Sequence, residues 1–382
     1  MSVLFEPTKI KAMVIRNRFV RSATVDNGAV AGHVSENQVR RFTELAEGEV
    51  GLVVTGMNFV HPSDQMLPSQ NSIAGDDYIP DYKRLTASVH DRGAKIALQL
   101  AHVGRERGKR LKGNELALAP SFIENDPYCE TRNYRAMTQE EIWEIIDKFG
   151  DAARRAREAN FDAVQIHGAH AWLLSQFLSP YTNHRSDDWG GSLENRLRIH
   201  FEIYRNIRTK VGKDYPVLIK FGVQDAFPGG LEFKEGEKAA QLLSQLGFDA
   251  LEISQGLRGK WFEGTEFRTK INRRDREAYF RDWCKKIKHQ VKVPVMMVGG
   301  LRTFELMEEI IQNGESDFIS LCRPFIREPD LIKHLKRGNQ RRVECISCNK
   351  CIEVLKNGES LYCPQKKAKK IIHPNAMDKF KE

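Results

Sequence analysis

Two histidines follow an apolar run in the stretch QIHGAHAWL, residues 165–173. Residues three apart on a regular strand point to opposite faces, so His167 and His170 reach one pocket only if the strand ends between them, which Gly168 makes easy. Side chains placed in this way are metal ligands, packing residues or hydrogen-bond donors to a substrate. A zinc site needs three or four ligands, and the predicted strand ends offer only His102 as a third.

Four of the seven cysteines lie near the C-terminus, in CISCNKC (345–351) and in the Cys-Pro pair at 363–364. Without a secretory signal, cysteines at such spacing are typical of metal ligands rather than disulfides. A CxxCxxC loop can bind three corners of an iron–sulfur cubane, and a distant Cys-Pro can supply the fourth. Four thiolates also suit tetrahedral zinc.

Eight short apolar or β-branched runs recur, each followed by a charged stretch with helical periodicity. The runs are residues 17–24, 50–56, 95–100, 162–168, 216–222, 249–256, 294–300 and 317–324. One helical stretch, 140–160, opens with TQEE at 138–141, in which Thr138 and Glu141 form a capping-box pair. Eight strand–helix repeats predict an α/β fold, a (β/α)8 TIM barrel, over residues 1–340, followed by a four-cysteine segment over 341–382. A doubly wound sheet is the alternative, but it lacks its GxGxxG fingerprint here.

Barrel enzymes carry their chemistry at the C-terminal ends of the strands. All eight predicted ends are polar, charged or glycine: Thr24, Gly56, Gln99 with His102, His167 with His170, Lys220, Ser254 with Gln255, Gly299 with Gly300, and Arg323. Backbone amides of the Gly299–Gly300 pair, just before a helix, suit an anion. A tight turn would also explain the pair, but Arg323 at the next strand end adds a guanidinium fork. We therefore predict a phosphate site.

The composition is typical of a globular enzyme, with 41% hydrophobic and 29% charged residues among 382. The sequence has no signal-like segment and no apolar run of about 18 residues, so we expect a cytoplasmic protein that does not enter membranes. The net charge of +9 is a mild excess. The basic run KKAKK at 366–370 is typical of a solvated tail, and no nucleic-acid motif accompanies it.

Over residues 1–340 the chain resembles the old yellow enzyme family of FMN-dependent oxidoreductases. The motifs that carry the resemblance are LFEPTKI (4–10), RNRFVRSAT (16–24), VGLVVTG (50–56), QLAHVGR (99–105), IHGAHAWLLSQFLSPYTNHRSDDWGGSLENR (166–196), VGG (298–300) and CRPFIREPDL (322–331). The resemblance implies FMN at the mouth of the barrel and NAD(P)H as reductant. It also implies hydride transfer to an activated alkene, such as an enone or enoyl substrate, and a homo-oligomer.

The resemblance further implies roles for single residues. His167 and His170 would donate hydrogen bonds to a substrate carbonyl oxygen, as in an oxyanion hole. Lys220 would lie beside flavin N1 and the C2 carbonyl, where positive charge stabilises the reduced anion. Taken alone, Lys220 would also suit a salt bridge or a Schiff-base lyase. The remaining cofactor-binding positions are Ser22, Ala23, Thr24, Gly56, Gln99, Gly299, Gly300, Cys322 and Arg323.

Trp172 departs from the family pattern, in which a tyrosine at this position protonates the substrate. An indole cannot serve as a general acid. Either water or another side chain is then the donor, with Tyr128 and Tyr134 as candidates, or the reaction is not simple alkene reduction. We keep Trp172 as a catalytic position, with its ring stacking on a planar substrate.

Relatives of the dienoyl-CoA reductase and trimethylamine dehydrogenase types carry a [4Fe-4S] cluster just after the barrel, at similar spacing. A cluster is therefore favoured over zinc, and zinc over an empty site, on the ligands Cys345, Cys348, Cys351 and Cys363. NAD(P)H or a ferredoxin-like carrier would then reduce FMN. The alternatives are an oxidative dehydrogenase or demethylase that exports electrons through the cluster, and a zinc-stabilised interaction module.

Overall fold

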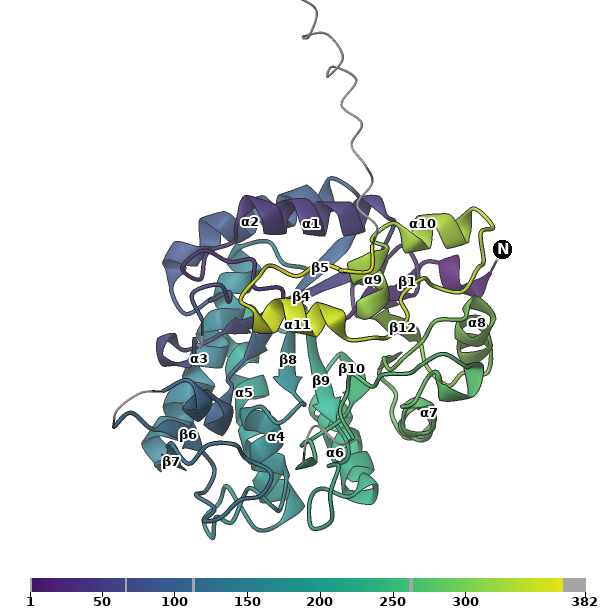
Figure 1. The fold of residues 1–382 in the computed structure, drawn as a ribbon. Coiled ribbons are helices and arrows are strands. Elements are labelled where there is room, and N and C mark those ends of the chain that lie inside the picture. Colours follow the sequence, from purple (N-terminus) through teal and green to yellow (C-terminus); the bar gives the residue numbers. More distant parts are fainter. Residues whose placement is uncertain (1, 66, 112–113, 261–263, 367–382) are drawn as a thin grey trace, which may run out of the picture.

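Eight parallel strands close into a barrel in the computed structural model, which describes residues 2–65, 67–111, 114–260 and 264–366. Residues 367–370 of the basic run lie outside this part. The strands, drawn in Figure 1, are β3 (Phe19–Arg21), β4 (Leu52–Phe59), β5 (Lys95–Ala101), β8 (Ala163–Gly168), β9 (Val217–Gly222), β10 (Ala250–Ser254), β11 (Val295–Met297) and β12 (Phe318–Leu321). Each falls on one predicted run, which confirms the TIM barrel.

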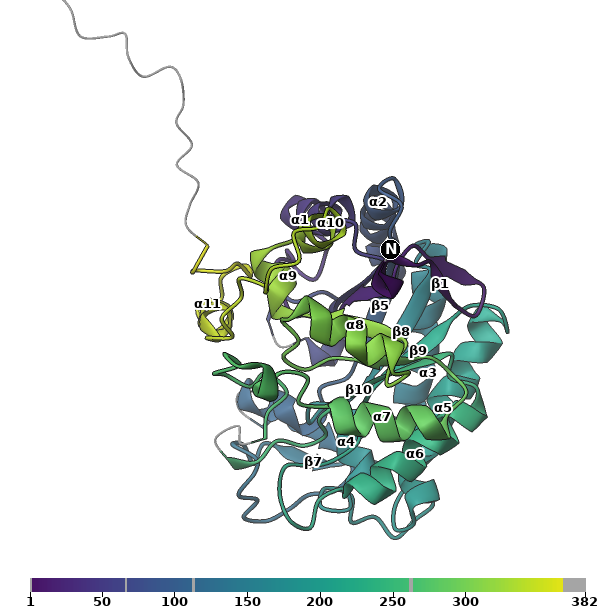
Figure 2. The same cartoon turned by 90° about the vertical axis from the view of Figure 1, so that its right-hand side faces the viewer.

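Helices surround the barrel (Figure 2). The longer ones are α1 (Glu36–Glu47), α2 (Ile79–His90), α3 (Gln139–Glu158), α5 (Leu193–Val211), α6 (Phe233–Leu246), α7 (Arg281–Gln290) and α8 (Phe304–Gln312). The short ones are α4 (Leu173–Leu178), α9 (Arg323–Arg327), α10 (Leu331–Lys336) and α11 (Lys350–Lys356). The predicted capping box begins α3, because Thr138 Oγ1 accepts from the Glu141 amide and the Glu141 carboxylate accepts from the Thr138 amide.

The barrel interior changes from apolar to polar along the strands. Its lower layers consist of Val20, Leu52, Val54, Ala97, Ala163, Leu218, Ala250, Met296 and Phe318, together with Ile10, Met13 and Ile15 from the hairpin β1 (Thr8–Ile10) and β2 (Met13–Ile15). Side chains two residues further along a strand point to the same face. That step leads from Leu218 to Lys220 and from Ala250 to Glu252, so the polar layer lies directly above the apolar one.

The C-terminal segment, residues 341–366, packs against the mouth of the barrel. The two views together place α11 over one end of the barrel (Figure 1 and Figure 2). The Val343 amide donates to the Arg302 carbonyl at 3.0 Å, and the Leu361 amide donates to the Asp26 carbonyl at 2.8 Å. Val343, Val354 and Leu361 are buried. The segment is thus attached to the barrel by both apolar and backbone contacts.

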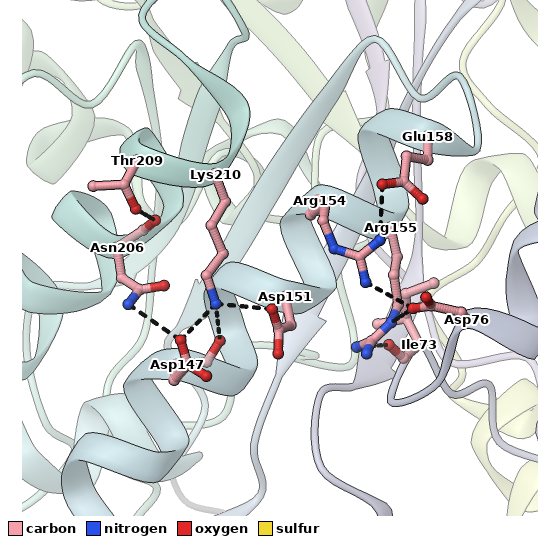
Figure 3. A network of polar contacts seen from close by, with 10 residues as sticks. All are labelled: Ile73, Asp76, Asp147, Asp151, Arg154, Arg155, Glu158, Asn206, Thr209 and Lys210. Atoms are coloured by element: carbon pink, nitrogen blue, oxygen red, sulfur yellow. Dashed lines mark hydrogen bonds and ion pairs between the residues drawn. The ribbon is translucent and has the colours of Figure 1, made fainter.

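Charged side chains connect neighbouring helices on the outer surface, as Figure 3 shows. Lys210 of α5 pairs with Asp151 of α3 at 2.8 Å, and Arg154 and Arg155 of α3 both pair with Asp76. Exposed ion pairs contribute only about 0–1 kcal/mol each. This network therefore supports the outer ring without forming a functional site.

Asp162, just before β8, accepts hydrogen bonds from His90, Lys95 and the Ile96 amide. Burial alone would raise the pKa of Asp162, but these bonds outweigh burial and lower its pKa. A lowered pKa stabilises the fold above the unfolded value of about 3.9 and loses this effect at lower pH. We expect Asp162→Asn to cost about 1–3 kcal/mol at neutral pH. Urea unfolding should show the difference from wild type shrinking below about pH 4. An equal difference in unfolding free energy at neutral pH and below about pH 4 would contradict this account.

Candidate active site

A cavity of about 1310 Å³, including its open part, lies at the C-terminal mouth of the barrel. Predicted site residues that line it are Ser22, Ala23, Thr24, Gln99, His167, His170, Trp172, Lys220, Gly299, Gly300, Cys322, Arg323, Cys345 and Cys351. Residues just after β3 and residues of α11, far apart in sequence, therefore line the same cavity.

Gly56 is not among the residues that line this cavity, so its predicted contact with the cofactor ring has no support in the geometry. A close backbone approach explains why a glycine stands at position 56. A Cβ atom at position 56 would lie 2.6 Å from the Thr24 carbonyl oxygen, too close for any side chain. Gly56 thus allows β4 to approach the loop after β3, and Met57 supplies the cavity wall.

The histidine pair faces the cavity because β8 ends at Gly168. His170 and Ala171 then adopt left-handed backbone angles, with φ of 60° and 65°. Non-glycine residues rarely adopt this region, and such strain is concentrated at functional sites. The ring centroids of His167 and His170 lie 5.0 Å apart, with the planes at 88°. The turn thus places both imidazoles in one pocket, as the sequence predicts.

The two rings differ in their partners. His170 Nε2 lies 2.8 Å from Ser254 Oγ, and its Nδ1 lies 3.6 Å from the Glu266 carboxylate. His167 Nδ1 is buried and has no hydrogen-bond partner in the described part of the chain. A buried polar atom without a partner is costly, so this nitrogen is suited to a ligand atom. The sequence analysis missed Glu266, which follows no strand.

Both imidazoles are neutral at ordinary pH. Burial lowers the pKa of His170 to about 3, against the opposing effect of Glu266. Burial, helped by His170 and Lys220, also lowers the pKa of His167 well below its usual value. We expect the affinity for a neutral enone or phenol to stay constant between about pH 5 and about pH 8. Equilibrium titrations across this range test this, and a sigmoidal change centred near about pH 6.5 would contradict it.

One end of the cavity is rich in arginine and glycine. Gly299 and Gly300 have φ of 125° and 75°, and a Cβ atom at either would lie within 3.0 Å of the Tyr279 ring. Arg302, which the sequence analysis missed, is buried, and its Nε has no hydrogen-bond partner in the described residues. Arg323 donates to the Arg268 carbonyl at 2.8 Å and to Asn349 Oδ1 at 2.6 Å.

The first amides next to α8 are already occupied. The Arg302 and Thr303 amides both donate to a Glu277 carboxylate oxygen at 2.8 Å. Glu277 therefore takes the two amides that follow the Gly299–Gly300 pair. The binding of an anion by the amides of Gly299 and Gly300 themselves stays a prediction. The cationic guanidinium groups of Arg302 and Arg323 are the groups at this end that suit an anion.

The four predicted metal-ligand cysteines line one small cavity of about 330 Å³ beside the main one. Cys345 and Cys351 line both cavities, whereas Cys348 and Cys363 line only the smaller. Within residues 2–366, apart from the undescribed gaps, no three His, Cys, Asp or Glu side chains are close enough to hold one metal ion. The thiols therefore share a cavity without the spacing of a single-ion site.

Trp172 lies beside the histidines, with its ring centroid 6.2 Å from that of His167. The two tyrosines considered as proton donors are elsewhere. Tyr128 stacks on Phe227 with ring centroids 3.8 Å apart, and the Tyr134 hydroxyl donates to the Ile123 carbonyl. Neither lines the main cavity, although Tyr128 lines a second cavity that shares Arg258 with it.

A model of the NADH:flavin oxidoreductase / NADH oxidase family matches residues 3–342. The chain belongs to this family. It is 35% identical over 356 residues to the NADH oxidase of Thermoanaerobacter brockii, covering 91% of this chain and 52% of that protein. It therefore spans about half the length of this relative.

Solved structures agree with this membership. A 2-naphthoyl-CoA reductase complex superposes with a TM-score of 0.86 at 27% identity, covering 94% of this chain and 56% of the other. The old yellow enzyme homologue of Zymomonas mobilis superposes with a TM-score of 0.74 at 25% identity, covering 95% and 98%. Both superpositions support membership of the NADH:flavin oxidoreductase family, and this family implies FMN and NADH or NADPH. Among its described helices, none is long and apolar enough to cross a membrane.

Proposed function

We propose that the main cavity binds FMN and an activated alkene, such as an enone or enoyl compound, with NAD(P)H as the reductant. When bound, FMN supplies the transfer of hydride from NAD(P)H to the alkene. The donor set suits FMN: Arg302 and Arg323 for the phosphate, and Lys220 and Gln99 for the polar edge of the ring. Ser22, Ala23, Thr24 and Met57 also line the cavity, and their small or apolar side chains suit a flat ring.

The observation that carries the proposal is the unpartnered, buried Nδ1 of His167 in the same cavity as Lys220. A neutral imidazole N–H there would donate to the substrate carbonyl oxygen, and His170 would supply the second donor. Negative charge grows on that oxygen when hydride arrives at the β-carbon. Fixed donors in a water-poor pocket stabilise such charge more than water does.

We further propose that Cys345, Cys348, Cys351 and Cys363 bind a [4Fe-4S] cluster. Tetrahedral zinc with Zn–S of about 2.3 Å would need sulfurs about 3.8 Å apart. The four thiols line one cavity, and a CxxCxxC loop with a distant Cys-Pro is the ligand pattern of a cubane. Arg327, 3.8 Å from Cys363 Sγ, adds positive charge beside thiolates. Cys348 is exposed, which suits exchange with an external ferredoxin-like carrier. The homo-oligomer and the cytoplasmic location stay predictions.

An absorption spectrum of protein purified without oxygen, with iron, zinc and acid-labile sulfide assays, tests both proposals. We expect a flavin band and about four irons per chain. Cys348→Ser should lose iron, whereas Cys284→Ser should keep it, because Cys284 is buried and lines neither cavity. Zinc in place of iron would contradict the cluster alone, and absence of flavin from folded protein would contradict the main proposal.

Glu266 favours a second candidate, an amine dehydrogenase or demethylase that runs in the oxidative direction. Burial would raise the pKa of Glu266, but Arg258 and His170 outweigh burial and hold it well below its usual range. Its carboxylate is therefore charged and lies beside His170, where it could bind an ammonium group. Anaerobic reduction of the bound flavin by amines, without NADH, would support this candidate. Reduction of the flavin by NAD(P)H but not by amines would exclude this candidate.

A further inference from the structure

A buried polar network lies below the cavity, in the layer above the apolar barrel core. The Lys220 ammonium donates to Ser22 Oγ at 2.7 Å and pairs with Glu252 Oε2 at 3.3 Å. The Ser22 hydroxyl donates to Glu252 Oε1 at 2.7 Å. Gln165 donates to Glu252 Oε2 at 2.9 Å and accepts from Gln99 at 2.8 Å. Glu252 is therefore the common acceptor of the network.

Backbone register fixes this arrangement. Glu252 of β10 stands directly opposite Lys220 of β9, and Lys220 stands opposite His167 of β8. The Glu252 side chain is 0% exposed and the Lys220 side chain 4%. Lys220 lines the cavity, whereas Glu252 does not. The carboxylate thus lies behind the ammonium group as seen from the cavity.

The two charges have opposite effects on a flavin above them. Two electrons and one proton convert oxidised flavin into its reduced anion, so negative charge develops on the ring. A nearby ammonium group stabilises that anion, and a carboxylate behind the ammonium reduces the effect. The strength of the field at the cavity depends on how fully Glu252 neutralises Lys220.

We propose that Glu252 is a positioning residue that sets the reduction potential of FMN, by holding the Lys220 ammonium and partly neutralising its charge. This inference rests on the proposed FMN site. Ser22 contributes by connecting the two charged groups, because it accepts from one and donates to the other. Gln165 donates to the carboxylate as well, and Gln99 in turn donates to Gln165.

The test is the midpoint potential of the bound FMN, read from the flavin band during equilibration with a redox dye. Glu252→Gln keeps the size of the side chain and removes its charge. We expect the ratio of reduced to oxidised FMN at a fixed potential to rise about tenfold, which is about 30 mV more positive for a two-electron couple. A potential equal to that of the wild type, or more negative, overturns the proposal.

Two further variants make the result specific. Glu315→Gln is the matched control, because Glu315 is buried and paired with Arg281 but does not line the cavity. The midpoint potential of FMN in this variant should equal that of the wild type. If Glu252→Gln does not fold, Glu252→Asp withdraws the charge by one methylene and should give a smaller positive shift, whereas no shift overturns the proposal. Flavin content is measured on every sample. Absence of flavin from the wild-type protein would contradict the proposed function. Bound flavin whose potential does not shift in Glu252→Gln would contradict only this inference.

Discussion

His167→Ala combined with His170→Ala is expected to lower kcat/KM for an enone about 10²–10³-fold while FMN stays bound. The reason is that both imidazoles line the cavity, whereas the proposed phosphate ligands are Arg302 and Arg323. Phenolic ligands, which mimic the substrate oxygen, should lose affinity in the same variant. Steady-state kinetics and ligand titration by absorbance measure the two effects.

His200→Ala is the control for loss of a buried imidazole. His200 is 0% exposed, both its nitrogens are without partners in the described residues, and it lies in α5 away from the cavity. We expect it to reduce stability and to leave phenol affinity per folded protein unchanged. Retained ligand affinity in the double variant at His167 and His170 would refute their role as donors to the substrate oxygen.

Trp172→Tyr is expected to speed the reduction of simple enones by about 10²-fold, because a phenol can protonate the substrate carbon and an indole cannot. Trp172 lines the cavity beside His167, so a hydroxyl introduced there reaches the substrate region. Stopped-flow measurement of the oxidative half-reaction isolates this step from reduction by NAD(P)H.

Trp172→Phe separates acid catalysis from a change of size. It removes the indole and adds no proton donor, so we expect no gain in rate. A gain as large as that of Trp172→Tyr would show that space, rather than protonation, limits the reaction. No gain in either variant would indicate that water or the substrate itself meets the need for a proton.

The sequence was sufficient to predict the barrel because each strand is a short apolar run with a polar end. The same rule found Lys220 and Arg323, which stand at or near those ends. It missed Glu252, which lies inside an apolar run and is buried by pairing across the sheet. It also missed Glu266 and Tyr279, because their loop follows no periodic pattern and only tertiary packing brings it to the cavity.

Other features of the site depend on tertiary packing in the same way. Gly56 makes a close approach to the Thr24 carbonyl, which no local pattern reveals, and its contact with the cofactor stays a prediction. Glu277, from a distant loop, occupies the Arg302 and Thr303 amides just after the Gly299–Gly300 pair. Spacing along the chain predicts which residues reach the mouth of the barrel. It does not predict which of them find partners within the protein.

The position of α11 has a consequence for how the holoprotein is assembled. Cys345, Cys351 and Leu355 form part of the cavity wall, yet the ribosome makes them after all eight strands. While the chain is being synthesised, the barrel can therefore close before this side of its mouth does. We expect the proposed FMN to enter most freely during that interval. Insertion of the cofactor and docking of residues 341–366 would then be successive steps in the maturation of the protein.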